Sequence, residues 1–298
     1  MWVRFWGTRG SIPTTGSQTL RYGGNTTCVE LRTDAGELFI LDFGSGARQL
    51  GLHLMEAGSP TQQGHILITH LHWDHIQGMP FFTPLYARGG VWNIYGPAPT
   101  EGTLRDALAV QMSAPFFPVT LEQLGAEIHF HDLDEGVFKI GGVSVSTKWL
   151  NHPGPTLGYR LEADGVAVVY ICDHEPYGLA TPSAVEEIDP RDQRHMAFME
   201  GADLVIHDAQ YIARDYAEKR GWGHSLGDYV VELCCRAGVR QVALTHHDPT
   251  RTDPMIEASL RDLRLAFMDR KSVPDVIAAA EGERLRVGTV GTKHQEDW

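Results

Sequence analysis

Four side chains that can bind metal ions lie within six consecutive positions of the sequence. They are His70, His72, Asp74 and His75. The apolar run 65–69 directly before them is predicted to be a buried strand. Imidazole nitrogens and carboxylate oxygens are the ligands that zinc, manganese and iron take in proteins, and a loop after a rigid strand can direct such side chains into one pocket. The spacing therefore predicts a metal site rather than a solvated, histidine-rich turn.

The pattern His-x-His-x-Asp-His in this stretch resembles the defining motif of the metallo-β-lactamase superfamily. Three further stretches with ligand-type side chains follow in the order that this superfamily shows, each at the end of a predicted strand. They are Asn151-His152-Pro153-Gly154, Cys172-Asp173-His174 and Leu244-Thr245-His246-His247-Asp248. In the last stretch His246 is the expected ligand, because it directly follows the strand, and His247 is not.

The resemblance implies a site for two divalent metal ions with seven protein ligands. These are His70, His72 and His152 for the first ion, Asp74, His75 and His246 for the second, and Asp173 as the bridge between them. Zinc is the expected ion, with manganese or iron as alternatives. Two cations about 3.5–4 Å apart can deprotonate a bridging water near neutral pH and neutralise charge in a phosphoryl transition state.

Two aspartates are expected to have supporting roles. Asp74 is expected to orient the attacking hydroxide as well as to bind metal. Asp42 ends the predicted strand 38–42 before a glycine turn. In this superfamily an aspartate so placed supports the ligand histidines from behind. A plain turn or helix N-cap is the alternative for Asp42.

Short runs of β-branched and aromatic residues, closed by Gly, Asn, Asp or Pro, recur along the whole chain. They predict strands at 2–6, 27–32, 38–42, 65–69, 91–95, 127–130, 143–149, 156–162, 167–172, 204–207, 241–245 and 276–279. Apolar residues at helical spacing predict helices at 46–57, 100–112, 195–200, 226–237 and 255–269. This pattern favours an α/β fold of two sheets covered by helices. With the resemblance, we expect the metallo-β-lactamase fold, an αββα four-layer sandwich of two mixed sheets flanked by helices.

No proline- or serine-rich linker and no block of like charges divides the chain. We therefore expect a single domain over residues 1–298. Loop insertions are expected near 113–120 and 176–200, where turn-forming residues gather.

Two stretches near the N-terminus resemble the start of the branch that contains the tRNA 3′-end endonuclease RNase Z and small-molecule phosphodiesterases. They are Phe5-Trp6-Gly7-Thr8-Arg9-Gly10-Ser11-Ile12-Pro13 and Tyr22-Gly23-Gly24-Asn25-Thr26-Thr27-Cys28. Val205 to Tyr211 and Gly223-His224-Ser225 resemble the same branch.

In this branch an acidic residue and a histidine form a proton relay toward the leaving oxygen, and these map onto Asp208 and His224. RNase Z typically has Glu in place of the Asp. The alternative is that Asp208 and His224 only hydrogen-bond each other.

The charge of the chain points to a small substrate. The formal net charge is −13, with 25 Lys and Arg against 38 Asp and Glu, whereas long nucleic acids are held by many basic contacts. Asp173 follows His152 by only 21 positions, an interval in which RNase Z proteins often insert a tRNA-binding arm. We expect a small or cyclic anionic phosphodiester and no long nucleic acid. Candidate residues for the wall of the site are Met79, Phe81, Phe82, Phe116, Phe117 and Trp222.

Other functions use the same ligands and stay open. A thioester or lactone hydrolase would direct the same hydroxide at a carbonyl carbon. A tRNA 3′-end endonuclease and a two-iron oxidoreductase are further enzyme alternatives, although the latter usually carries a flavodoxin-like partner domain. The alternative outside enzymes is a metal-binding scaffold or sensor.

The remaining sequence features concern the location of the protein. Cys28, Cys172, Cys234 and Cys235 form no C-x-x-C pair, and two of them are adjacent, so no disulfide framework is expected. No signal peptide and no run of about 18 apolar residues occurs. We expect a cytoplasmic protein without a membrane segment. A homodimer is compatible with this branch.

Overall fold

The computed structural model describes residues 1–56, 63–178 and 188–288. The α-helices are α1 (Ala47–Glu56), α2 (Trp73–Ile76), α3 (Leu104–Gln111), α4 (Pro190–Met199), α5 (Ala213–Lys219), α6 (Gly227–Ala237) and α7 (Asp253–Phe267). The strands are β1 (Trp2–Gly7), β2 (Cys28–Arg32), β3 (Leu38–Leu41), β4 (Gln63–Leu67), β5 (Val91–Pro97), β6 (Glu127–Leu133), β7 (Gly136–Ile140), β8 (Val143–Trp149), β9 (Leu157–Ala163), β10 (Val166–Ile171), β11 (Leu204–Asp208), β12 (Gln241–Thr245), β13 (Asp275–Ala278) and β14 (Arg284–Arg286).

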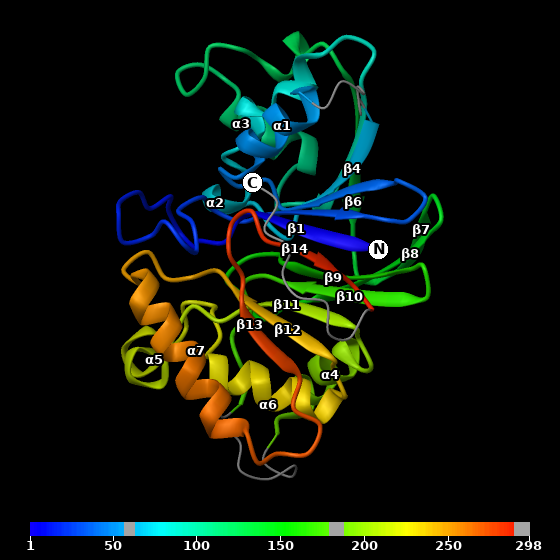
Figure 1. Ribbon diagram of the computed structural model, residues 1–298. Coiled ribbons are helices and arrows are strands. Elements are labelled where there is room, and N and C mark those ends of the chain that lie inside the picture. The colour runs from blue at the N-terminus through cyan, green and yellow to red at the C-terminus, as the bar shows by residue number, and fades with distance from the viewer. Residues whose placement is uncertain (57–62, 179–187, 289–298) are drawn as a thin grey trace.

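Two mixed sheets of seven strands pack face to face in the middle of the molecule (Figure 1). The first has the order β14-β1-β2-β3-β4-β5-β6 and the second the order β13-β12-β11-β10-β9-β8-β7. Helices α1 and α3 cover the outer face of the first sheet, and α4, α6 and α7 cover that of the second. The predicted four-layer αββα fold is confirmed.

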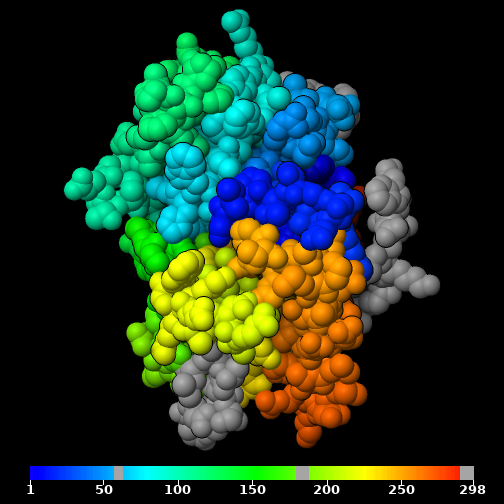
Figure 2. All heavy atoms as spheres, turned by 90° about the vertical axis from the view of Figure 1, so that its left-hand side faces the viewer, coloured from blue at the N-terminus to red at the C-terminus, as the bar shows by residue number. Residues whose placement is uncertain are grey.

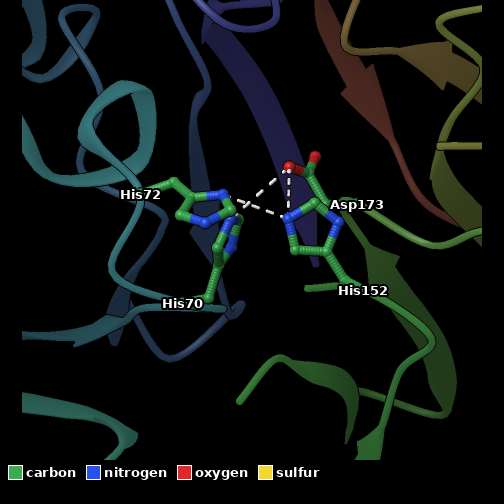
Figure 3. Close-up of side chains that lie close together, drawn as sticks. All are labelled: His70, His72, His152 and Asp173. Atoms are coloured by element: carbon green, nitrogen blue, oxygen red, sulfur yellow. Dashed lines mark hydrogen bonds and ion pairs between the residues drawn. The ribbon is translucent and has the colours of Figure 1, made fainter. Parts of the chain in front are cut away.

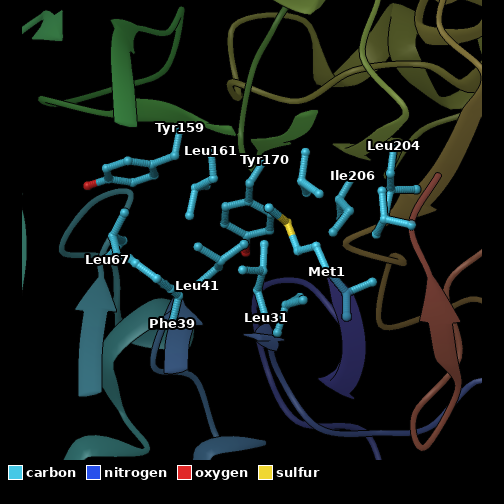
Figure 4. Packing of buried hydrophobic residues seen from close by; sticks show 14 of the residues in the cluster. Met1, Leu31, Phe39, Leu41, Leu67, Tyr159, Leu161, Tyr170, Leu204 and Ile206 are labelled. Atoms are coloured by element: carbon cyan, nitrogen blue, oxygen red, sulfur yellow. The ribbon is translucent and has the colours of Figure 1, made fainter. Parts of the chain in front are cut away.

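The central core lies between the two sheets (Figure 4). It contains fully buried side chains from both inner faces, among them Phe39, Leu41 and Leu67 from the first sheet and Tyr159, Tyr170 and Ile206 from the second. Burial of one such side chain stabilises the fold by about 1.5–3 kcal/mol. The hydroxyl group of Tyr159 donates to the carbonyl oxygen of Ile68 at 2.6 Å, so it is paired although buried.

The strand directions bring the predicted site residues to one edge of the sandwich. β10, β11 and β12 run parallel, as do β3, β4 and β5. β8 has the direction of β10, because each is antiparallel to β9. The carboxyl ends of parallel strands meet at the same edge of a sheet, where ligand sites are usually built.

Most predicted elements are present, and the differences have local causes. The strands β7 and β14 and the helices α2 and α5 were not predicted. β7 is mostly exposed, β14 and α2 have only three and four residues, and α5 buries none of its side chains. Helix α4 begins at Pro190, after the N-cap Asp189, and not at 195 as predicted. It therefore occupies part of the expected insertion at 176–200, of which residues 179–187 lie outside the described residues. The segment 113–120 is loop and turn, as predicted, and the single-domain division stays a prediction.

All four cysteines are free thiols, as predicted. Within the described ranges we find no helix that combines the length and the apolar character needed to cross a membrane.

Three buried histidines lie between α4, β11 and the end of β10. The ring of His195 stacks on that of His174 with centroids 3.8 Å apart, and its Nε2 lies 3.1 Å from Nε2 of His207. Burial lowers the pKa of all three imidazoles, that of His207 to about 4. The three rings are therefore neutral in the folded protein at neutral pH.

Because the pKa of His207 is lower in the folded than in the unfolded chain, its contribution to stability is present above pH 6.5 and is lost as the pH falls toward 4. Between pH 7.5 and pH 5 the wild type should lose about 2 kcal/mol of unfolding free energy from this one group. The His207→Gln variant, compared by urea denaturation at both pH values, should show a loss smaller by about that amount. Equal losses in the two proteins would contradict this origin.

Candidate metal centre

Seven donor side chains from four separate stretches of the chain converge at the carboxyl edge of the two sheets. His70 and His72 lie in the loop after β4, and Asp74 and His75 lie in α2. The other three follow the ends of strands and are His152 after β8, Asp173 after β10 and His246 after β12. The structure thus brings together every residue that the sequence predicted as a metal ligand.

The first cluster consists of three imidazoles around one oxygen of Asp173 (Figure 3). Oδ2 of Asp173 lies 3.5 Å from Nε2 of His70 and 3.6 Å from Nε2 of His152. Nδ1 of His72 lies 3.1 Å from Nε2 of His152. One donor atom from each of the four residues lies within 4.8 Å of the others, which is a spacing that can hold one metal ion.

The second cluster shares Asp173 and adds Asp74, His75 and His246. Nε2 of His246 lies 3.1 Å from Oδ1 of Asp173 and 3.1 Å from Oδ2 of Asp74. Nε2 of His75 lies 3.3 Å from an oxygen of each aspartate. Asp173 therefore contacts donors of both clusters, as a bridging carboxylate must.

Cys172 also lies close to the second cluster. Its sulfur is 3.9 Å from Oγ1 of Thr27, and the residue belongs to the core between the sheets. Burial and the adjacent Asp173 raise the pKa of the thiol well above its ordinary value, which keeps it protonated. Metal ions bind the thiolate, so this thiol is a poor ligand.

The outward nitrogens of the donor histidines are fixed by the surrounding chain. Nδ1 pairs with Thr69 Oγ1 in His70, with Asp42 Oδ2 in His75, with the carbonyl oxygen of Gly223 in His152 and with Gln210 Oε1 in His246. Such partners select the tautomer and the ring orientation of a metal-binding histidine. They leave Nε2 of each of these rings pointing toward the aspartates.

Asp42 has the supporting position that the sequence suggested. Its carboxylate accepts hydrogen bonds from the backbone nitrogen of Thr69 at 2.7 Å, from His75 Nδ1 at 2.9 Å and from the Tyr170 hydroxyl at 2.8 Å. Asp42, Asp173 and His246 all have positive φ angles, of 57°, 65° and 60°. This conformation costs on the order of 1–3 kcal/mol for a residue other than glycine, and it persists at functional sites where the surrounding structure enforces it.

The carboxylates of the site favour a positive charge between them. Burial alone would raise the pKa of Asp173, but His246, His75 and His224 hold it well below its usual range. Burial would also lower the pKa of His75, but Asp74, Asp173 and Asp42 raise it well above the ordinary value. Burial lowers the pKa of His70, so that its ring stays neutral with a free lone pair.

Three inward atoms form no hydrogen bond among the described residues, although each lies 3.1–3.5 Å from an atom of opposite charge type. They are Nε2 of His70, Nε2 of His75 and Oδ1 of Asp173, all fully buried. A buried polar atom without a partner destabilises a protein by about 1–3 kcal/mol. Divalent cations at these atoms would remove that cost, so the donor set fits the metal ions that the sequence implies.

His224 and Asp208 form a pair beside the two clusters. Nδ1 of His224 lies 3.1 Å from Oδ2 of Asp208, and its ring stacks on His246 with centroids 5.0 Å apart. Burial opposes protonation of His224, but Asp173 and Asp208 raise its pKa to about 9. Asp208 also accepts from the backbone nitrogens of Gln210 and Ser225, which fixes its carboxylate.

Two supporting residues were not predicted, because their contacts join segments far apart in the sequence. Gln210 orients His246 across 36 positions, and its only sequence signal is its place two residues after Asp208. Glu175 is buried and accepts from the backbone nitrogens of Gly221 and Gly223, next to His224.

The prediction of the residues that line the wall of the site was partly wrong. Met79 and Phe82 are fully buried in the core under α1 and α3, and so they cannot face a substrate. Phe81, Phe116 and Trp222 are exposed, and Phe117 is half-buried against Phe81.

Comparison with known proteins agrees with this geometry. Residues 40–247 match the family model described as "Beta-lactamase superfamily domain". The protein named Ribonuclease Z from Staphylococcus carnosus is 25% identical over 287 residues, which cover 83% of this chain and 88% of that protein.

Two solved structures share the fold. A diphosphatase from the PhnP family has a TM-score of 0.66 and 17% identity, over 96% of this chain and 97% of its own. The short form of human tRNase Z has a TM-score of 0.63 and 19% identity, over 97% of this chain and 100% of its own. With the matched domain covering most of the sequence, the chain belongs to the metallo-β-lactamase superfamily and is a hydrolase of that superfamily.

Proposed function

We propose that this protein is a phosphodiesterase that hydrolyses small or cyclic phosphodiesters with the help of two divalent metal ions, foremost zinc, with manganese or iron as alternatives. Support comes from the two clusters around Asp173 and from the inward atoms that form no hydrogen bond. In this proposal His70, His72 and His152 hold one ion and Asp74, His75 and His246 the other. When bound, the ions would lower the pKa of a water molecule and neutralise negative charge on the phosphoryl oxygens.

Asp74 is proposed to orient the attacking group as well as to bind metal. Its Oδ2 accepts a hydrogen bond from the backbone nitrogen of Ser11 at 2.8 Å and lies 3.1 Å from Nε2 of His246. The N-terminal loop thus fixes one side of the carboxylate. A carboxylate held in this way can accept a proton or fix a lone pair at a constant place.

His224 is proposed to give a proton to the leaving oxygen. Asp208 holds Nδ1 of its ring, and no hydrogen bond to Nε2 is formed by any residue in the described ranges. The pKa of about 9 keeps the ring protonated at neutral pH. Cations nearby would lower this pKa toward neutrality, where an acid transfers its proton most effectively.

The proposal of a small substrate rests mainly on the short connection between His152 and Asp173. β9 and β10 form a direct hairpin in which Ala163 pairs with Val166, and Asp164 and Gly165 make the turn. The segment therefore has no room for the protruding arm that RNase Z proteins often insert at this place. The net charge of −13 also disfavours a long polyanion.

A tRNA 3′-end endonuclease is the second candidate. The alignment with proteins named Ribonuclease Z extends over 83% of the chain, and this finding does not support our expectation that long nucleic acid is excluded. A thioester or lactone hydrolase and a metal-binding scaffold are further alternatives, and the same experiment distinguishes them. Cytoplasmic location and a homodimer stay predictions.

The test is metal content and hydrolysis measured on one preparation. We expect two divalent ions per chain by elemental analysis, and cleavage of bis-p-nitrophenyl phosphate and of at least one cyclic nucleotide. Removal of metal with a chelator should abolish cleavage, and zinc or manganese should restore it. Cleavage of precursor tRNA alone would favour the endonuclease, and turnover of a lactone or thioester alone would overturn the phosphodiesterase. Two bound ions with no turnover of any substrate would favour the scaffold.

The role of His224 predicts a dependence on the leaving group. His224→Ala should lower kcat for a cleaved cyclic nucleotide about 100-fold, the usual size of general acid catalysis, because its alkoxide leaves poorly without a proton. The loss should be below about tenfold with bis-p-nitrophenyl phosphate, whose p-nitrophenolate needs little protonation. Asp208→Asn should show the same pattern more weakly. Equal losses for both leaving groups, at unchanged metal content, would argue against proton donation.

The hydrogen bond from His75 to Asp42 predicts an effect on metal binding. Asp42→Asn should weaken the binding of one ion about 10- to 100-fold, as the loss of such support usually does. Competition with a chromophoric chelator would measure the change. Asp262→Asn, at an exposed position on α7, is the matched control and should bind metal as the wild type does. Unchanged affinity in the Asp42 variant would contradict its supporting role.

A further inference from the structure

The loop 221–223 joins a predicted metal ligand to the proposed proton donor. The carbonyl oxygen of Gly223 lies 2.9 Å from Nδ1 of His152, and His224 is the next residue of the chain. The rings of His152 and His224 are also in contact, with centroids 5.5 Å apart. Gly223 has a φ of 88°, and a Cβ at this position would lie 2.1 Å from Nδ1 of His152. A shift of the loop would therefore move both histidines.

This loop is not held by buried apolar side chains of its own. Helix α5 directly before it buries none of its side chains, and every residue from Ile212 to Trp222 is half-buried or exposed. The segment lies at the surface, in yellow on the side of the molecule that faces the viewer in Figure 2. Segments with few buried apolar contacts open locally at low free energy. The position of Gly223 therefore depends on polar contacts.

A single buried carboxylate, that of Glu175, makes such contacts at both ends of the loop. Its Oε1 accepts from the backbone nitrogen of Gly221 at 2.7 Å and from the Tyr216 hydroxyl at 2.9 Å. Its Oε2 accepts from the backbone nitrogen of Gly223 at 2.8 Å. A hydrogen bond to an ionised acceptor is about twice as strong as one between neutral groups. Both oxygens of the carboxylate thus hold the loop.

Glu175 is itself fixed to two segments that carry predicted metal ligands. It follows Asp173 by two positions, after the end of β10. Its backbone nitrogen donates to the carbonyl oxygen of Asn151 at 2.8 Å, and its carbonyl oxygen accepts from the side-chain nitrogen of Asn151 at 2.8 Å. Asn151 directly precedes His152. The residue therefore connects the loop to the metal centre through its side chain and its backbone.

We propose that Glu175 is a positioning residue that holds the loop 221–223, so that the metal ligand His152 and the proton donor His224 keep fixed places relative to each other. The inference rests on the proposed phosphodiesterase function. A misplacement of a reacting group by about 1 Å can lower a rate about 100-fold. Loss of this one carboxylate should therefore disturb metal binding and proton donation together.

The test combines metal affinity with the comparison of leaving groups. Glu175→Gln keeps the shape of the side chain but places an amide nitrogen opposite a donor N–H. Its affinity for one of the two ions, measured by competition with a chromophoric chelator, should fall about tenfold. With both ions bound, kcat for a cyclic nucleotide should fall at least about tenfold, and that for bis-p-nitrophenyl phosphate less than about threefold. Tyr216→Phe removes one donor and leaves both backbone contacts, so it should show the same two effects more weakly.

Two control variants separate positioning from a general loss of stability. Glu122→Gln, at an exposed position, should change neither the metal affinity nor the two rates. Leu54→Ala removes a buried side chain from the core under α1 and should lower the melting temperature without changing either readout.

The outcomes distinguish this inference from the proposed function. If diesters are hydrolysed and Glu175→Gln shows only one of the two effects, or neither, the inference is wrong and the phosphodiesterase stands. If Leu54→Ala loses metal affinity as Glu175→Gln does, the role of Glu175 is merely structural and the inference also fails. If Glu175→Gln alone loses affinity while even the wild type cleaves no diester, the positioning of His152 stands and the proposed function falls.

Discussion

The buried carboxylate of Asp173 is the constraint on which the rest of the structure depends. It lies 3.1–3.6 Å from imidazole nitrogens of His70, His75, His152 and His246. The first two of these residues follow a strand of the first sheet and the other two follow strands of the second, so the carboxylate lies at the junction of the sandwich. A buried anion must be compensated by opposite charges, hydrogen bonds or bound metal ions. Metal binding at this point would therefore join the two sheets, and folding and metal affinity should be linked.

A second buried network of hydrogen bonds connects the central core to this junction. Tyr170 extends from the second sheet through the central core, and its hydroxyl group donates to Asp42 at the end of β3 in the first sheet. Asp42 in turn orients His75 and, through Thr69, the loop that carries His70. A buried polar network with every member paired is rigid, because any movement leaves a polar group unpaired. His70 and His75 are thus fixed by a polar network that the core between the sheets holds in place.

The fold could be predicted because it depends on local signals. The side chains that meet at the edge of the sheets could be named because they follow predicted strands in the order of the superfamily that the sequence resembles, and their roles as metal ligands stay predictions. Apolar runs set the strands, and the histidines and aspartates follow their ends within a few positions. The wall of the site was predicted poorly, because an aromatic residue in a loop has the same local pattern whether it packs inward, as Phe82 does, or faces solvent, as Phe81 does. Glu175 and Gln210 act across 48 and 36 positions, contacts that no local pattern indicates.

The contrast between an acidic surface and a cationic centre bears on substrate size. Two divalent ions would more than neutralise Asp74 and Asp173, so the centre would carry excess positive charge inside a chain whose net charge is −13. Interactions between exposed charges fall off over about 8–10 Å in physiological salt. A small diester could sit within this distance of the ions alone. A long polyanion must also lie along the acidic surface, and it would need a compensating contact elsewhere.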